Sequence, residues 1–139
     1  MKKLLPVALL LLVCTSALLA QTNSYKILFD ITSKDTADHQ TVIRHISGMS
    51  KAYPDAELEV VIYGGAWPMV VKEKSTVTES VLSLCRNQNV HFKLCEETMK
   101  RQRIDKNLLI PGVQTVPDAI IELVTKQGQG WGYIKESHK

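Results

Sequence analysis

The sequence has little of several features that would assign a function class at once. Among 139 residues there are three cysteines, too few for a disulfide-stapled scaffold, and 6% aromatic residues. No Cys-x-x-Cys pair occurs, no His/Cys/Asp cluster has metal-ligand spacing, and the pair Gly64-Gly65 lacks the other glycines of a phosphate loop. These absences argue against a thioredoxin-like oxidoreductase and a nucleotide-binding loop, and we expect no metal site and no cofactor.

The one long apolar run lies at the start of the chain. Two lysines precede the apolar stretch 4–13, which softens into Cys-Thr-Ser-Ala-Leu-Leu-Ala and ends at the small residue Ala20. A basic start, a short apolar centre and a small boundary residue predict a secretory signal peptide, cleaved after Ala20. A retained membrane anchor is the alternative, but the stretch 4–20 is at the short limit for crossing a bilayer. We therefore expect an exported protein, periplasmic or secreted, with no membrane attachment after cleavage.

Removal of residues 1–20 changes the charge and the cysteine count. It takes two of the 17 basic residues and leaves 119 residues with 15 basic and 14 acidic side chains, a net charge of +1. A basic surface for nucleic acid is therefore not indicated. The remaining chain, 21–139, has the length of one domain that stands on its hydrophobic core. Cys14 leaves with the signal, so that only Cys85 and Cys95 remain.

Short apolar runs alternate with helical patterns along residues 21–139. Strands are expected at 25–31, 58–63, 90–95, 113–116 and 131–134, the first two of them buried. Helices are expected after the capping residues 32–38, around 77–85, briefly at 96–101, and from 117 to 128 with Ile120, Ile121 and Val124 as apolar residues. This alternation predicts an α/β three-layer sandwich with about five mostly parallel strands and helices on both faces.

Two segments suggest surface covered by another subunit. In the expected strand 90–95, Val90, Phe92 and Leu94 alternate with a mixed set of side chains, which places this strand nearer a sheet edge or an oligomer contact than the first two strands. The apolar stretch 67–71 follows the second strand. Together they predict a homo-oligomer.

The residues that follow the strands share one edge of a parallel sheet, where ligands usually bind. They include Cys95, the only strong nucleophile among them, just before a helical turn whose free N–H groups favour a thiolate. Lys93, two residues earlier, helps this charge, whereas Glu96 and Glu97 oppose it. The sequence allows a reactive Cys95 and equally a thiol that only packs. A strand-end pocket is expected from Asp30, Tyr63, Gly64, Gly65 and Thr98.

Other candidate groups carry less chemistry. Cys85 lies on the apolar stripe of its helix, and the strand between the two cysteines separates them by roughly 17 Å, so we expect no disulfide. His91 is too far along the strand to act as the base for Cys95. The basic residues Lys100, Arg101 and Arg103 form either a solvated face or a docking site for an acidic partner.

The order of these features resembles the DsrE/DsrF-like family, in particular its small single-domain branch. The resemblance is carried by Phe-x-x-Cys-x-x-Thr at 92–98, Pro-Gly-Val at 111–113, Val-Pro at 116–117 and Gly-Trp-Gly-Tyr at 130–133, and it extends over nearly all of 21–139. It implies a five-stranded α/β sandwich that assembles as a trimer or hexamer. Bacterial members with signal peptides occur, in keeping with the prediction for residues 1–20.

The resemblance also implies a function. In the sulfur-relay members of this family, a cysteine at the end of the third strand carries sulfur as a persulfide and passes it between proteins. Cys95 occupies that position, so the resemblance makes this chain a sulfurtransferase-like carrier with a sulfur donor or acceptor protein as partner. The match does not include the histidines that many relatives have at the ends of strands one and two, where this chain has Asp30 and Tyr63. A non-catalytic module that binds a small ligand or assembles into oligomers is the alternative.

Overall fold

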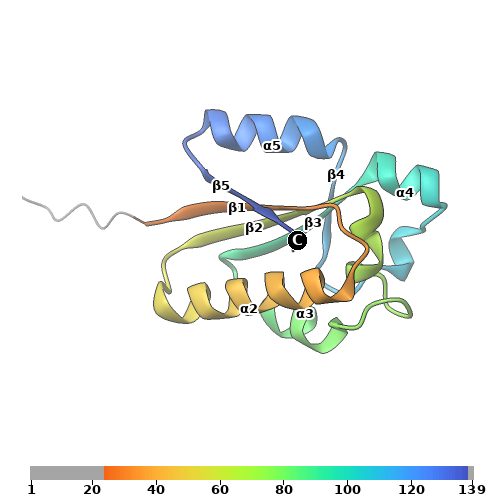
Figure 1. Ribbon diagram of the computed structural model, residues 1–139, viewed down its shortest axis with the longest axis horizontal. Helices are drawn as coiled ribbons and strands as arrows, with labels where there is room; N and C mark the ends of the chain where they lie inside the picture. The colour runs from red at the N-terminus through yellow and green to blue at the C-terminus, as the bar shows by residue number, and fades with distance from the viewer. Residues whose placement is uncertain (1–23, 138–139) are drawn as a thin grey trace, which may run out of the picture.

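The computed structural model describes residues 24–137, and the predicted signal peptide, residues 1–20, lies outside this range (Figure 1). The strands are β1 (Lys26–Ile31), β2 (Glu57–Ile62), β3 (Val90–Cys95), β4 (Gln114–Val116) and β5 (Gly132–Glu136). The α-helices are α2 (Thr36–Ala52), α3 (Thr78–Leu84), α4 (Glu96–Gln102) and α5 (Ala119–Gly128), and the 3-10 helices are η1 (Gly64–Val70) and η2 (Lys106–Leu108). All strands pair in parallel.

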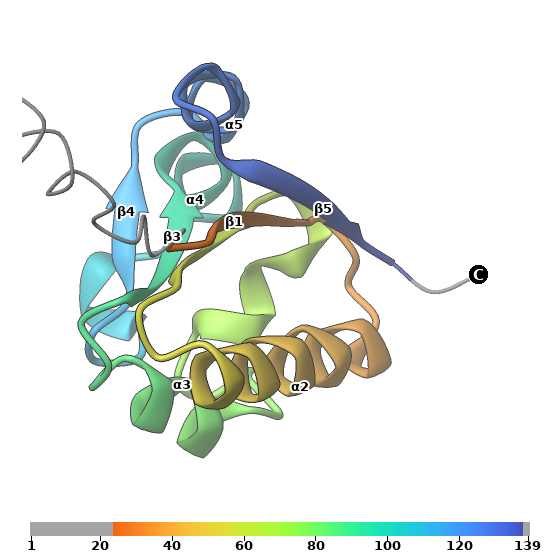
Figure 2. The same cartoon turned by 90° about the vertical axis from the view of Figure 1, so that its left-hand side faces the viewer.

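The sheet order is β4-β3-β2-β1-β5, with α2 and α3 on one face and α5 on the other (Figures 1 and 2). The chain adds strands in one direction from β1 to β4, and α5 then carries it back across the sheet to β5, beside β1. Right-handed crossovers place helices on opposite faces when the direction of strand addition reverses. The predicted three-layer α/β sandwich is confirmed.

Strand β3 is second from the β4 edge of the sheet, nearer to an edge than β2 but no nearer than β1, so the prediction that it lies nearer an edge than both strands holds only against β2. It pairs with β2 over five residues and with β4 through Lys93, Leu94 and Cys95. The edge strands are β4 and β5. The polar residues of β3 have a different cause, because Lys93 forms ion pairs beneath α5.

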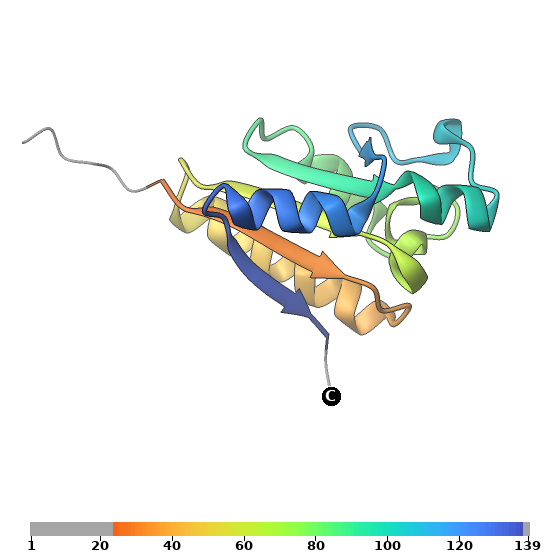
Figure 3. The same cartoon turned by 90° about the horizontal axis from the view of Figure 1, so that it is seen from above.

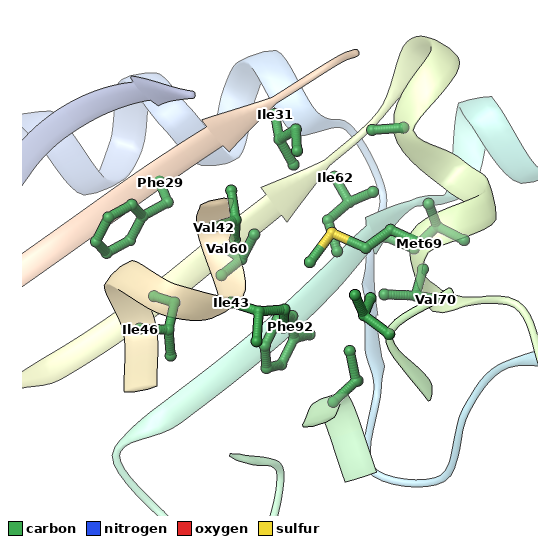
Figure 4. Packing of buried hydrophobic residues seen from close by; sticks show 14 of the residues in the cluster. Phe29, Ile31, Val42, Ile43, Ile46, Val60, Ile62, Met69, Val70 and Phe92 are labelled. Atoms are coloured by element: carbon green, nitrogen blue, oxygen red, sulfur yellow. The ribbon is translucent and has the colours of Figure 1, made fainter. Parts of the chain in front are cut away.

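The main core lies between the sheet and the layer of α2, α3 and η1 (Figure 4). Its largest fully buried side chains include Phe29, Phe92 and Met69. The apolar stretch 67–71 belongs to this core, since Met69, Val70 and Val71 are buried within the chain itself. The prediction that this stretch is covered by another subunit is therefore wrong for these three residues.

A smaller core lies between the sheet and α5. Leu28, Val61, Cys95, Ala119, Leu123 and Trp131 form this cluster. Helix α5 begins at the cap Asp118, whose carboxylate accepts from the N–H groups of Ile120 and Ile121. The helix buries Ala119 and Leu123, whereas Ile120, Ile121 and Val124, expected as its apolar face, are 54–63% exposed. None of the helices in the described range has the length and apolar character needed to cross a membrane.

Candidate functional site

The ends of β1, β2 and β3 bring the predicted site residues to one edge of the sheet. Asp30 is the penultimate residue of β1, Tyr63 follows β2, and Cys95 ends β3. Since these three strands are neighbours in a parallel sheet, their carboxyl ends lie side by side. The strand order thus brings these three residues to one edge of the sheet.

Cys95 is a free thiol, and only 4% of the residue's surface is exposed. It packs in the small core between the sheet and α5, against a group that includes Ala119 and Leu123, with Tyr63 at the rim of the same cluster. It is also the residue immediately before α4. The thiol therefore combines a strand-end position with an enclosed, largely apolar surround.

Asp30 is the centre of a hydrogen-bonded group beside this cluster. Its carboxylate accepts from the hydroxyl of Tyr133 at 2.6 Å and from Lys135 Nζ at 2.9 Å. Lys135 also donates to Thr32 Oγ1 at 3.0 Å, and its Nζ lies 5.6 Å from the ring centroid of Tyr63. The Tyr63 hydroxyl contacts Asp30 Oδ2 at 3.5 Å, too long for a strong hydrogen bond. The side chain of Asp30 is 4% exposed, so Lys135 neutralises a nearly buried charge.

Both tyrosines keep their protons well above neutral pH. Burial, followed by the charge of Asp30, the hydrogen bond to it and the charge of Cys95, raises the pKa of Tyr63 to about 12. The hydrogen bond to Asp30, with burial and the Asp30 charge, raises the pKa of Tyr133 to about 12. At neutral pH both phenols are hydrogen-bond donors.

The glycines and Thr98 shape the loop after β2. Gly64 has a positive φ of 58°, and its N–H donates to Thr98 Oγ1 at 3.2 Å. A Cβ added to Gly65 would lie 3.0 Å from the carbonyl oxygen of Thr32, so this position holds the β2 loop close to the β1 loop. Gly64 and Gly65 thus fix the backbone of the loop after β2, and the side chain of Thr98 holds that loop through the N–H of Gly64.

The two glutamates at the start of α4 pair with lysines, one on α4 and one on η2. Lys100 lies 2.6 Å from Glu97, and Lys106 lies 2.9 Å from Glu96. The hydrogen bond and charge of Glu97, with smaller contributions from Glu96 and Cys95, raise the pKa of Lys100. Arg101 Nη2 lies 3.4 Å from Thr98 Oγ1.

Cys85 lies apart from this site. It caps the end of α3, is half-buried, and packs against the main core. Both cysteines in the described range are free, as expected from their separation along the chain. Burial raises the pKa of the Cys85 thiol. Among residues 24–137 no group of three or more His, Cys, Asp and Glu side chains is arranged to hold a metal ion.

Two parts of the site were not predicted from the sequence. Tyr133 and Lys135 reach Asp30 because β5 inserts beside β1, and only the long crossover from β4 determines that placement. Their alternation along the last strand would have placed both on one face, which is the only signal available. Glu59, in the middle of β2, is fully buried and lies 2.9 Å from Lys93 and 3.0 Å from Lys126.

Comparisons with known proteins identify the fold. No family model matches the chain, and no curated protein matches it. Among solved structures, the protein MTH1491 from Methanobacterium thermoautotrophicum superposes with a TM-score of 0.75 and 25% identity, covering 81% of this chain and 99% of that one. The ychN protein from E. coli has a TM-score of 0.68 and 14% identity over 81% and 98% of the two chains.

A third structure, BT1422 from Bacteroides thetaiotaomicron, has a TM-score of 0.65 and 11% identity over 79% and 93% of the chains. MTH1491 and BT1422 were described as proteins of unknown function. The resemblance seen in the sequence is thus confirmed at the level of the fold, and the chain has a DsrE-like α/β fold.

Proposed function

We propose that this protein is an exported sulfur carrier in which Cys95 holds a sulfane sulfur as a persulfide. The observation that supports it best is the position of Cys95, a free thiol at the carboxyl end of β3 beside Tyr63 and the start of α4. Strand ends of parallel sheets are where such folds bind and react. The DsrE-like fold shared with the solved structures supports the same assignment.

The transfer needs no metal and no external oxidant or reductant. The Cys95 thiolate attacks the outer sulfur of a donor persulfide, R–S–SH. A new S–S bond forms at Cys95, the donor S–S bond breaks, and R–S⁻ leaves with its electron pair, while the proton stays on the transferred sulfur. In the second half, a thiolate of an acceptor protein attacks that outer sulfur and the Cys95 thiolate leaves.

Tyr63 is the donor that we assign to this sulfur. Its ring packs at the rim of the cluster that holds Cys95, and its pKa of about 12 keeps the hydroxyl protonated. The 3.5 Å contact to Asp30 is weak, which leaves the hydroxyl available for a stronger acceptor. Tyr63→Phe should slow sulfur transfer by roughly five- to tenfold, the effect of one hydrogen bond.

The test is to incubate the purified protein with a sulfane-sulfur donor and locate any added sulfur by mass spectrometry. We expect one added sulfur atom on Cys95, removable by reductant, in the wild type and in Cys85→Ser. Cys95→Ser should add none. Equal addition in Cys95→Ser and wild type would refute the carrier function.

A non-catalytic module is the second candidate, because Cys95 is only 4% exposed and the Asp30 group is already satisfied internally. In that case the strand-end residues bind a small ligand or support assembly, and Cys95 only packs. Ligand-induced stabilisation would then survive Cys95→Ser, and the thiol would never gain sulfur. Self-association into a trimer or hexamer is compatible with either function.

A further inference from the structure

Cys95 lies in the small core between the sheet and α5. The cysteine belongs to the core layer beneath this helix, and Ala119 and Leu123 of α5 pack in the same cluster. In Figure 3, α5 crosses the sheet on the face turned toward the viewer. With 4% of the residue exposed, a protein thiol or a bulky reagent cannot reach the sulfur while α5 lies in this position.

Few apolar contacts hold α5 on the sheet. Of its ten residues, only Ala119 and Leu123 are buried, and the larger Ile120, Ile121 and Val124 face outward. The hydrophobic effect scales with apolar area removed from water, so this helix gains less from packing than its sequence allows.

An ionic cluster provides the rest of the attachment. Lys93 of β3 lies 2.8 Å from Glu122 of α5 and 2.9 Å from Glu59 of β2. Lys126 of α5 lies 3.0 Å from the same Glu59 oxygen, and its Nζ is 4.2 Å from the ring centroid of Trp131. Two carboxylates and two ammonium groups thus join the helix to the two strands.

The four side chains of the cluster carry two negative and two positive charges, and the loss of any one of them would leave a charge unpaired. Glu59 is fully buried, and within residues 24–137 its Oε1 atom has no hydrogen-bond partner. Burial acts to raise the pKa of Glu122, but the hydrogen bond with Lys93 and the charges of Lys93 and Lys126 outweigh it, so that the pKa is lowered. A buried ion group is stable only when complete, because removing one member leaves an uncompensated charge.

We propose that α5 is a cover over Cys95, held closed by the cluster of Glu59, Lys93, Glu122 and Lys126, and that bulky thiol reagents reach Cys95 when α5 opens while the sheet stays folded. The hinges about which α5 would move are the turn at Asp118 and the glycines that follow the helix, of which Gly130 has a φ of 86°. The proposal rests on the proposed function in one respect: sulfur transfer is the reaction for which Cys95 would become accessible. The opening itself requires no sulfur donor.

The experiment measures how fast Cys95 reacts with the disulfide reagent dithiobis(nitrobenzoate). In the full chain carrying Cys14→Ser and Cys85→Ser, Cys95 is the only thiol. The ratio of its rate in native buffer to its rate in concentrated urea gives the open fraction, and urea below the unfolding transition distinguishes local from global opening.

We expect the native rate to be at least about a hundredfold below that of the unfolded chain, with a shallow dependence on urea. Glu122→Gln should raise the native rate about tenfold, as should Lys126→Met, which removes the contact to Glu59. Glu57→Gln is the matched control: it removes the same charge from an exposed pair with Lys26 at the far end of the sheet, and should change the rate less than twofold.

Three results would overturn the cover. They are a native rate equal to that of the unfolded chain, a urea dependence as steep as that of global unfolding, and equal rates in Glu57→Gln, Glu122→Gln and Lys126→Met. The two proposals fail separately. If reagent access to Cys95 depends on the opening of α5 but no persulfide forms, the cover is supported and the carrier function is excluded. If a persulfide forms on a Cys95 that reacts as fast as in the unfolded chain, the carrier function is supported and the cover is excluded.

Discussion

Replacing Lys135 by methionine tests whether the Asp30 group holds the site together. Lys135 lies 2.9 Å from Asp30, whose side chain is 4% exposed, and it donates in addition to Thr32. Methionine keeps most of the apolar stem but leaves the Asp30 carboxylate without its cation. Tyr133 still donates at 2.6 Å, so the loss is partial.

The expected loss of stability depends on how deeply the ion pair is buried. Removing one partner of a fully buried ion pair costs about 3–5 kcal/mol, and an exposed pair is worth about 0–1 kcal/mol. Since the Lys135 side chain is 40% exposed and Asp30 retains Tyr133, we expect a loss of about 1–2 kcal/mol. Lys26→Met is a matched control, because Lys26 lies 2.9 Å from Glu57 in a pair whose side chains are 45% and 40% exposed. It should cost about 0.5 kcal/mol or less.

Urea unfolding of wild type, Lys135→Met and Lys26→Met measures both losses. Adding Asp30→Asn to Lys135→Met removes the stranded charge, so the double variant should be more stable than the sum of the two single effects predicts, by about 1 kcal/mol. Equal losses in the two lysine variants, or additive effects in the double variant, would show that burial of Asp30 does not govern this interaction.

Three further predictions concern the two tyrosines, Gly112 and the outward face of α5. Because the pKa values of Tyr63 and Tyr133 are raised to about 12, the stability that these two tyrosines contribute should be fully present below pH 10, the tyrosine pKa in the unfolded chain, and should be lost as the pH rises through 12. Ultraviolet titration of the phenolates in the wild type and in Tyr133→Phe measures these pKa values, and a pH-independent stability from pH 10 to 12 would contradict the assignment. Gly112→Ala should cost about 2–4 kcal/mol in urea unfolding, since Gly112 has a φ of 93° and the new Cβ would lie 2.6 Å from Cys85 Cβ, and an unchanged midpoint would count against this close approach. If the outward face of α5 mediates self-association, Val124→Lys should shift the protein toward monomer in sedimentation at micromolar concentration, whereas a wild-type protein that is already monomeric would exclude the oligomer.

The strand ends could be predicted because each strand is a short apolar run whose last residues are fixed by the sequence. Asp30, Tyr63 and Cys95 follow from that pattern and from the parallel arrangement alone. Tyr133 and Lys135 could not be placed, since their position beside Asp30 depends on a crossover spanning the whole sheet. Local periodicity contains no information about which strand the last one joins.

The orientation of α5 was predicted wrongly for a related reason. Hydrophobicity selects Ile120, Ile121 and Val124 as the inward residues, yet the helix packs through Ala119 and Leu123. The inward face must also accommodate Glu122 and Lys126, which pair with charges on β2 and β3. A buried carboxylate such as Glu59 within an apolar strand was the one signal of that arrangement.

The most direct test of the carrier function is the sulfur content of Cys95 after exposure to a sulfane-sulfur donor. Intact-protein and peptide mass spectrometry should find one additional sulfur atom on the peptide that contains Cys95, lost on reduction and absent from Cys95→Ser. Cys85→Ser should behave as the wild type. A wild-type protein whose Cys95 peptide gains no sulfur, although its thiol reacts with dithiobis(nitrobenzoate), would contradict the proposed function.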